Sequence, residues 1–425
     1  MSPSYEAAIE VPALDLAPDH PVAATMDQSL AVVWDIDRLG SLGLREGSGA
    51  LLHPEPLAIG IGLGLDYAFA MFLAPIPLAL THEEWHLAAL REGGVTGTNL
   101  FLQGEVTDVS DEELVAIKAN DPEDLVRAHA AGIESHNTLV RRIGDEAFLH
   151  GPEGARLGPL DLMGTWMAPH AQYAELNSWN YFRYCGSGQT DEVVPVVEDL
   201  EGTTVPRDFT GPDCTGWVRD LRRPDEPYAD RGAHASGEGI GRYVQSSDLT
   251  PDEQRLLKLQ TALHFVDLAN PHLLGIDRVH VGEVALTASL MHWLTPWGYA
   301  LDLHGGWRRG SGAAVLGALR LGIAERPTFP AVEVRVVDVP IGAALSLQTR
   351  TELWLQPRDL RYDGSPVPGG RLGARLGWRV VDRLSGYVGV DAKSAGWTPG
   401  VPALGPAVYG QLGATALLGR PSTTW

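Results

Sequence analysis

The 425-residue sequence has few cysteines, few basic residues and no segment with the features of a signal peptide. Its two cysteines, Cys185 and Cys214, leave two alternatives open: one structural disulfide, which would indicate an oxidising compartment, or two unrelated buried thiols. The net charge of -22 argues against a nucleic-acid-binding protein, because phosphate binding needs a basic surface. The first residues lack both a basic and an apolar segment, so residues 1–27 predict an extended acidic tail.

Composition and charge distribution predict two domains. With 44% hydrophobic and 20% charged residues the chain is too apolar to be disordered, and 49 Gly and 30 Pro are too many for an all-helical fold. Residues 1–275 hold 17 basic and 43 acidic residues, whereas residues 276–425 hold 15 and 11. We therefore expect an α+β protein whose acidic excess lies in its first part.

Residues 28–275 predict a mainly helical domain. The apolar run 56–81 is long enough to cross a bilayer, but Pro75 and Pro77 favour a kinked, buried core helix. Further along, the segment 186–248 is rich in Gly, Pro and Asp, so it predicts a long irregular insertion.

Residues 276–425 predict an antiparallel β-barrel of about eight strands, because apolar and polar residues alternate. In 371–381, for example, Arg371 and Arg375 share one face while Leu372 and Leu376 share the other. The eight predicted strands are 283–293, 298–308, 313–324, 331–339, 345–355, 371–381, 384–394 and 406–418. Such a barrel is either soluble, with its apolar face inward, or of the outer-membrane type, with that face toward lipid; strand length and the many tryptophans favour the second.

The pattern that carries chemistry is HExxH at His82-Glu83-Glu84-Trp85-His86. Positions four apart lie on one face of a helix, so His82 and His86 are candidate ligands of one Zn²⁺ ion. Glu83 is placed to act as general base on a zinc-activated water, whose pKa falls to about 7. The neighbouring Glu84 is predicted to face solvent.

With these residues the chain resembles the HExxH zinc metallopeptidases, and more narrowly the gluzincins. That resemblance implies a third ligand, a glutamate on a later helix, and Glu134 about 50 residues downstream is the matching residue. His136 is the rival third ligand and His129 a weaker one. The extended HExxHxxGxxH pattern is lacking, because Ala89 and Glu92 stand at its last two positions, which argues against a metzincin.

A hydrolase of this kind also needs a group that stabilises the oxyanion. The aromatic segment 159–184 supplies the candidates His170, Tyr173 and Tyr181. His264 and His272 are candidates for a second metal pair, but eight residues separate them, which argues against a shared ion while the helix persists.

The sequence thus predicts a membrane-associated zinc metalloprotease of the bacterial cell envelope, in the outer membrane or periplasm. Its partners would be a peptide or protein substrate, itself membrane-associated or lipidated, and the lipid bilayer. The alternative is a non-catalytic outer-membrane β-barrel protein whose acidic helical part serves as a plug or scaffold. Gly-rich stretches such as 60–64 lack the spacing of phosphate-binding loops, so no nucleotide is predicted.

Overall fold

The computed structural model describes most of the chain in twelve stretches. They are residues 7–16, 26–51, 55–73, 75–97, 108–150, 155–157, 160–162, 168–201, 207–310, 312–325, 328–381 and 384–418. Within these stretches helices dominate the part before residue 265, and antiparallel strands dominate the part after residue 275. The protein is therefore α+β.

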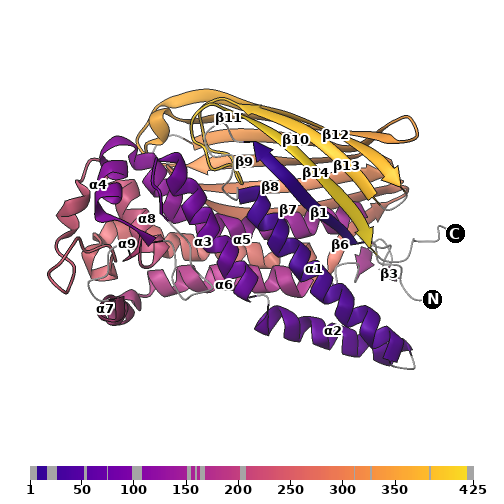
Figure 1. Cartoon of the computed structure of the whole chain (residues 1–425), viewed down its shortest axis with the longest axis horizontal. Helices are drawn as coiled ribbons and strands as arrows, with labels where there is room; N and C mark the ends of the chain where they lie inside the picture. Colours follow the sequence, from indigo (N-terminus) through magenta and orange to yellow (C-terminus); the bar gives the residue numbers. More distant parts are fainter. Residues whose placement is uncertain are drawn as a thin grey trace.

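The α-helices of the described residues lie beneath a large sheet and beyond one of its ends (Figure 1). They are α1 (Met26–Leu51), α2 (Glu55–Phe72), α3 (Pro75–Glu92), α4 (Asp111–Asn120), α5 (Pro122–His150), α6 (Ala168–Gly186), α7 (Thr190–Glu201), α8 (Asp213–Arg222) and α9 (Pro251–His264). Several ends follow from local sequence. Ser110 and Glu113 cap α4 reciprocally, Thr250 and Glu253 do the same for α9, and Gly94 leaves α3 in a left-handed conformation at φ 81°.

The apolar run 56–81 is divided between α2 and α3, with the break before Pro75. The prediction of a buried core helix is wrong for its middle part, because Tyr67, Met71, Phe72 and Leu73 are exposed. Among the described residues no helix is both long and apolar enough to cross a membrane.

The segment predicted to be an irregular insertion, 186–248, is partly helical. It contains α7 and α8, and α8 is almost entirely buried. Its helical content was missed because only one face of α8 is apolar and the flanking residues are rich in Gly and Pro.

The sheet has twelve strands in the order β1-β14-β13-β12-β11-β10-β9-β8-β7-β6-β4-β3, and every neighbouring pair is antiparallel. The strands are β1 (Ala7–Leu16), β3 (Ala155–Leu157), β4 (Leu160–Leu162), β6 (Ile276–Val281), β7 (Val284–Thr295), β8 (Gly298–Arg309), β9 (Ala314–Ile323), β10 (Thr328–Ile341), β11 (Leu345–Pro357), β12 (Pro366–Val381), β13 (Leu384–Lys393) and β14 (Ala407–Leu418). A separate pair joins β2 (Asp108–Val109) to β5 (Arg207–Asp208). The eight predicted strands coincide with β7 to β14. Residues 7–16, predicted to be part of an extended tail, form β1 on β14.

The prediction of a closed barrel is wrong: across the described strands the order begins at β1 and ends at β3, and these two edges do not pair. Helices instead cover the concave face, as Figure 1 shows for α1, α3 and α5. The cover is polar where α5 meets the strands. Arg141 donates to Glu333 of β10 at 2.7 Å, and Asp145 pairs with Arg335 of the same strand and with His304 of β8. In a closed barrel, strands across the lumen would pair with these inward charges. Here α5 pairs with them instead, so the sheet can stay open.

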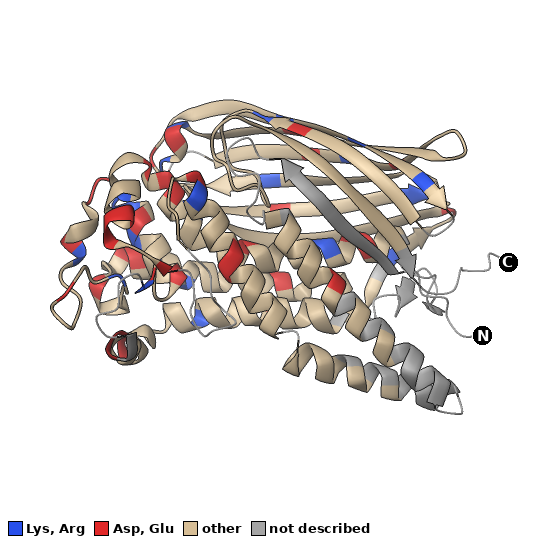
Figure 2. Cartoon of the chain, in the orientation of Figure 1, with Lys and Arg blue, Asp and Glu red and all other residues tan. Residues whose placement is uncertain are grey.

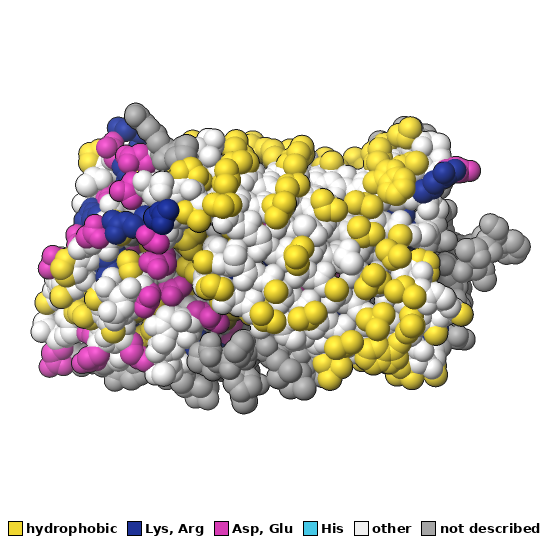
Figure 3. All heavy atoms as spheres, turned by 90° about the horizontal axis from the view of Figure 1, so that it is seen from above, with side chains coloured by type: hydrophobic (Ala, Val, Ile, Leu, Met, Phe, Trp, Pro, Cys, Tyr) yellow, Lys and Arg dark blue, Asp and Glu magenta, His cyan; other side chains and the backbone are white. Residues whose placement is uncertain are grey.

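The two faces of the sheet differ in polarity, and the apolar face points outward. Arg371 is buried on the concave side while Leu372, next to it, is 63% exposed on the convex side. Large apolar side chains recur across the convex face, among them Leu303, Leu319, Leu321, Val332, Val334, Leu353, Val388, Val390 and Leu412. Figures 2 and 3 show that charged residues gather at the end of the molecule that holds α4, α8 and α9, and that few lie over the strands.

Candidate metal centre

Helix α3 places His82 and His86 one turn apart on the same face, as the HExxH spacing predicts. Their ring centroids are 4.6 Å apart. Helix α5 faces them with Gly132, and a Cβ at that position would lie 2.4 Å from the Nε2 atoms of both imidazoles. A residue without a side chain is therefore required here for the two rings to come this close to α5.

The third group beside these imidazoles is Asp213, the first residue of α8. Its Oδ2 lies 3.0 Å from His82 Nε2 and 3.3 Å from His86 Nε2. His82, His86 and Asp213 each offer one ligand atom, and the three atoms lie within 4.8 Å of one another. They form a candidate metal-binding group that sequence reasoning did not complete, because Asp213 is 131 residues from His82 and belongs to no motif.

The donor atoms of this group suit a divalent metal such as zinc. The Nδ1 atom of His86 lies 2.6 Å from the carbonyl oxygen of Ala128, so Nδ1–H donates to it and Nε2 is the ring nitrogen that faces Asp213 and is placed to bind a metal. Two imidazole nitrogens and one carboxylate oxygen match the ligands of catalytic zinc sites, which keep a fourth position open. The His82 side chain is 17% exposed, which leaves one side of the group accessible to solvent.

The electrostatics of the group also favour a bound cation. Burial raises the pKa of the Asp213 carboxyl, but His86 and His82 overcome that effect and hold it well below its usual range. Burial lowers the pKa of His86, but Asp213 and then Glu83 raise it to about 9. The carboxylate is therefore ionised, and the space between it and the imidazoles favours positive charge.

Helix α8 is fixed on several sides, and this holds Asp213 in place. Cys214 forms a disulfide with Cys185 of α6, so the two cysteines are paired. The backbone N–H of Asp213 donates to Tyr181 Oη at 2.7 Å, and Trp217 Nε1–H donates to the carbonyl of Thr295 in β7.

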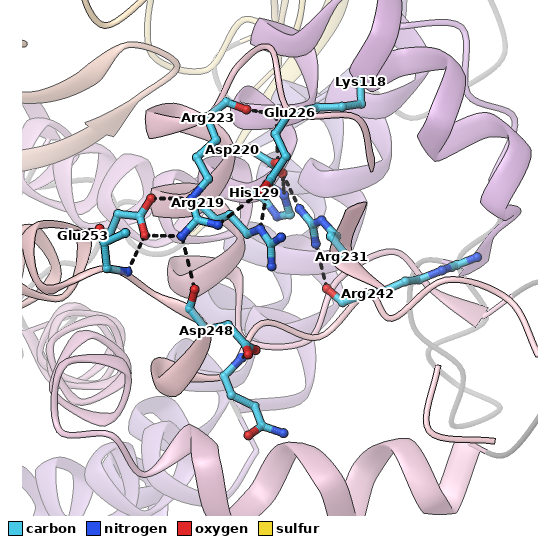
Figure 4. A network of polar contacts seen from close by, with 12 residues as sticks. Lys118, His129, Arg219, Asp220, Arg223, Glu226, Arg231, Arg242, Asp248 and Glu253 are labelled. Atoms are coloured by element: carbon cyan, nitrogen blue, oxygen red, sulfur yellow. Dashed lines mark hydrogen bonds and ion pairs between the residues drawn. The ribbon is translucent and has the colours of Figure 1, made fainter. Parts of the chain in front are cut away.

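One turn beyond these contacts, Asp220 anchors the same helix through a polar network (Figure 4). Its carboxylate accepts from Lys118 Nζ at 3.0 Å and from Arg231 Nη2 at 2.6 Å, and pairs with His129 Nε2 at 2.8 Å. His129, the weaker candidate ligand, thus belongs to this network and not to the candidate metal group.

The two predicted third ligands lie in different surroundings. The carboxylate of Glu134 is already held by Arg127, by Trp397 Nε1–H at 3.2 Å and by the backbone N–H of Gly400 at 2.8 Å. It is not part of the candidate metal group, and Asp213 stands where the resemblance implied a glutamate. His136 lies closer: its ring centroid is 5.1 Å from that of His82.

The predicted catalytic residues are likewise separated. Glu83 is half-buried on α3, and its charge raises the pKa of both His86 and Tyr181, which places it near the group. On α6, His170 packs against Phe69 of α2, and Tyr173 packs against the central core; neither is in the metal group. Of the three aromatic candidates, Tyr181 lies beside the candidate metal group: its ring centroid is 6.4 Å from that of His82.

A second histidine–carboxylate group lies deeper, where Glu175, His264 and Asp267 each offer one ligand atom within the same 4.8 Å limit. His272, the other candidate of the predicted second metal pair, belongs to neither group of the described residues. Its ring instead faces Gly144 of α5, about 3.6 Å from where a Cβ would lie.

Comparison with models of protein families finds no match, and comparison with curated proteins finds no similar sequence. A function is therefore inferred from the geometry of the group. The resemblance to HExxH peptidases stays a prediction from the motif.

Proposed function

We propose that the chain is a membrane-associated zinc-dependent hydrolase that cleaves peptide bonds, with His82, His86 and Asp213 as the metal ligands. The observation that carries the proposal is the approach of Asp213 Oδ2 to both HExxH imidazoles, at 3.0 and 3.3 Å. A zinc ion held there would polarise the substrate carbonyl and lower the pKa of a water to about 7.

The remaining steps fall to residues of the chain. Glu83 follows the first ligand on α3, so its carboxylate can accept the proton of the attacking water and pass it to the leaving amine. Tyr181 Oη accepts a hydrogen bond from the Asp213 backbone and keeps its own O–H free to donate. Burial, then Asp213 and Glu83, raise the pKa of Tyr181 well above its usual value, so the phenol stays protonated and can stabilise an oxyanion.

The membrane part of the proposal is supported by exposed apolar surface next to the metal group. Phe72, Leu73 and Ile76 are more than half exposed where α2 passes into α3. Ile76 precedes His82 by six residues, which is about 9 Å along a helix. A substrate anchored in lipid would therefore reach the metal group from the start of α3. The outward apolar face of the sheet also favours a location at a membrane of the bacterial cell envelope.

The test is hydrolysis of a mixed pool of fluorogenic peptides in detergent micelles, with and without a chelator. Wild-type activity should be lost with chelator and restored by Zn²⁺. Glu83→Gln should remove it, whereas Glu84→Gln, the adjacent carboxylate on the same helix, should not. Chelator-resistant activity, or full activity in Glu83→Gln, would overturn the proposal.

A second candidate function follows from the polarity of the sheet. Its convex face is apolar and its concave face is charged and covered by helices, which favours a non-catalytic outer-membrane protein with a helical scaffold. In that case the protein would need detergent for solubility, and Glu83→Gln would change no activity.

A further inference from the structure

The group Glu175, His264 and Asp267 is sealed inside the helical layer. Glu175 lies on α6, His264 ends α9, and Asp267 follows in the short 3-10 helix Phe265–Ala269. All three side chains are 0% exposed. His264 Nε2 is 3.6 Å from Glu175 Oε1, and His264 Nδ1 is 3.5 Å from Asp267 Oδ2.

A chain of hydrogen bonds fixes which nitrogen of His264 carries the proton. Gln260 Nε2 donates to the Leu256 carbonyl, so Gln260 Oε1 faces His292 and accepts from its Nε2–H at 2.7 Å. His292 Nδ1 is then an acceptor, and it lies 3.3 Å from His264 Nδ1, which must be the donor. The Nε2 atom of His264 is therefore left with a bare lone pair that faces Glu175.

The two carboxyls share a hydrogen bond with each other, and burial raises the pKa of both, to about 8 for Glu175. Among the described residues, four polar atoms of this group are buried and have no hydrogen bond to any residue outside the group. They are both carboxylate oxygens of Glu175, Oδ1 of Asp267 and Nε2 of His264. Asp267 Oδ2 accepts the backbone N–H of His292 at 2.8 Å. Among the described residues Glu175 and Asp267 each pair with His264, and neither forms an ion pair with a Lys or Arg.

Three lone-pair-bearing groups at this spacing, buried and with no Lys or Arg paired to them, favour positive charge between them, supplied either by shared protons or by a metal ion. We propose that Glu175, His264 and Asp267 bind a second divalent transition-metal ion, of which zinc is the one to test first. One imidazole and two carboxylates are a donor set that Zn²⁺ accepts. His292 and Gln260 orient the imidazole, as outer partners of metal-binding histidines do.

The sealed position defines the role of this ion. No ligand side chain reaches solvent, so the ion has no position open to a substrate and joins α6 to the end of α9 as a structural metal does. Helix α6 also carries Tyr181 and Cys185, which hold Asp213. The second ion thus supports the helix that positions the first group, while its binding does not depend on the proposed function.

Metal analysis of the whole purified chain, loaded with Zn²⁺ and dialysed, tests the inference. We expect two zinc ions per wild-type chain and one in Glu175→Gln, Asp267→Asn and the double variant His82→Ala, His86→Ala. Glu192→Gln, an exposed carboxylate on α7, should keep two. Glu175→Gln has nearly the same volume and supplies an N–H for His264 Nε2, so it should fold, and a retained thermal transition checks this.

The outcomes separate this inference from the proposed function. One ion in wild type that is lost only with the His82 and His86 substitutions would overturn the second site, because a shared proton would then fill the space between Glu175 and His264. One ion lost only with Glu175→Gln would support the second site and overturn the first. A metal-free wild type after loading would overturn both.

Discussion

The two histidine–carboxylate groups have similar chemistry but opposite access to solvent. His82, with a side chain 17% exposed, opens its group on one side, whereas Glu175, His264 and Asp267 are completely enclosed. In the first group the carboxylate already lies near 3 Å from two imidazoles; in the second, the nearest imidazole is about half an ångström further away. Access, more than ligand type, separates a centre suited to catalysis from one suited to holding helices together.

The largest expected difference between the groups is in catalysis. Glu83→Gln should lower kcat by about 10²- to 10⁴-fold, the usual contribution of a general base. Glu175→Gln should change kcat far less and lower thermal stability instead. Steady-state kinetics and thermal unfolding of both variants check this. Equal losses of kcat would show that the sealed group shares in the reaction.

The disulfide should matter next most. Replacing Cys185 and Cys214 by Ser removes a link between residues 29 apart, which should cost about 2–4 kcal/mol in the free energy of unfolding. Because Asp213 adjoins Cys214, zinc affinity at the first group should fall as well. Denaturant unfolding and zinc competition titration measure the two effects. Unchanged affinity would mean that Tyr181 and the Asp220 network suffice to hold Asp213.

Acid should destabilise the protein through His272. Burial lowers the pKa of this imidazole to about 4 in the folded chain, against 6.5 for an unperturbed histidine. The unfolded chain then binds more protons between these values, so stability is full above pH 6.5 and falls as the pH drops toward 4, by at most about 3 kcal/mol.

His272→Gln should flatten that part of the profile. Urea unfolding of wild type and variant at several pH values between 4 and 7 is the measurement. Parallel profiles would assign the acid sensitivity to other buried groups.

A pair of glycines on α5 offers the smallest and most local comparison. Gly132→Ala places a methyl group 2.4 Å from both HExxH imidazoles, so it should cost about 1–3 kcal/mol and weaken zinc binding at the first group only. Gly144→Ala meets its nearest atom at 3.6 Å and should be neutral or slightly stabilising. Zinc titration of the two variants side by side decides whether Gly132 is required for the group.

The parts of the site that could be predicted are the local ones. His82 and His86 share a helix face because of a four-residue spacing, and Gly94 ends that helix. Asp213 could not be predicted, since its approach depends on the packing of α8, the disulfide and the Asp220 network together. The ion pair between Glu134 and Arg127, two turns earlier, could not be predicted either, because a carboxylate in a helix-compatible segment gives no sign of its partner.

The fold divides in the same way. Alternation in 283–418 located strands β7 to β14, because a side-chain period of two is a local property. Whether a sheet closes depends on what covers its concave face, and here α5 brings Arg141 and Asp145 to the inward charges of β10. No single segment of the sequence contains that information.

The pairing of β1 with β14 determines the order in which the chain can assemble. Ala7 pairs with Leu418, so β1 leaves the ribosome long before its partner β14 has been made. Until then both strand edges are open to other chains, and the contact between them is among the most distant in sequence that this fold contains. The pairing of β1 with β14 must therefore come late in folding, and conditions that delay this pairing should favour aggregation over native protein.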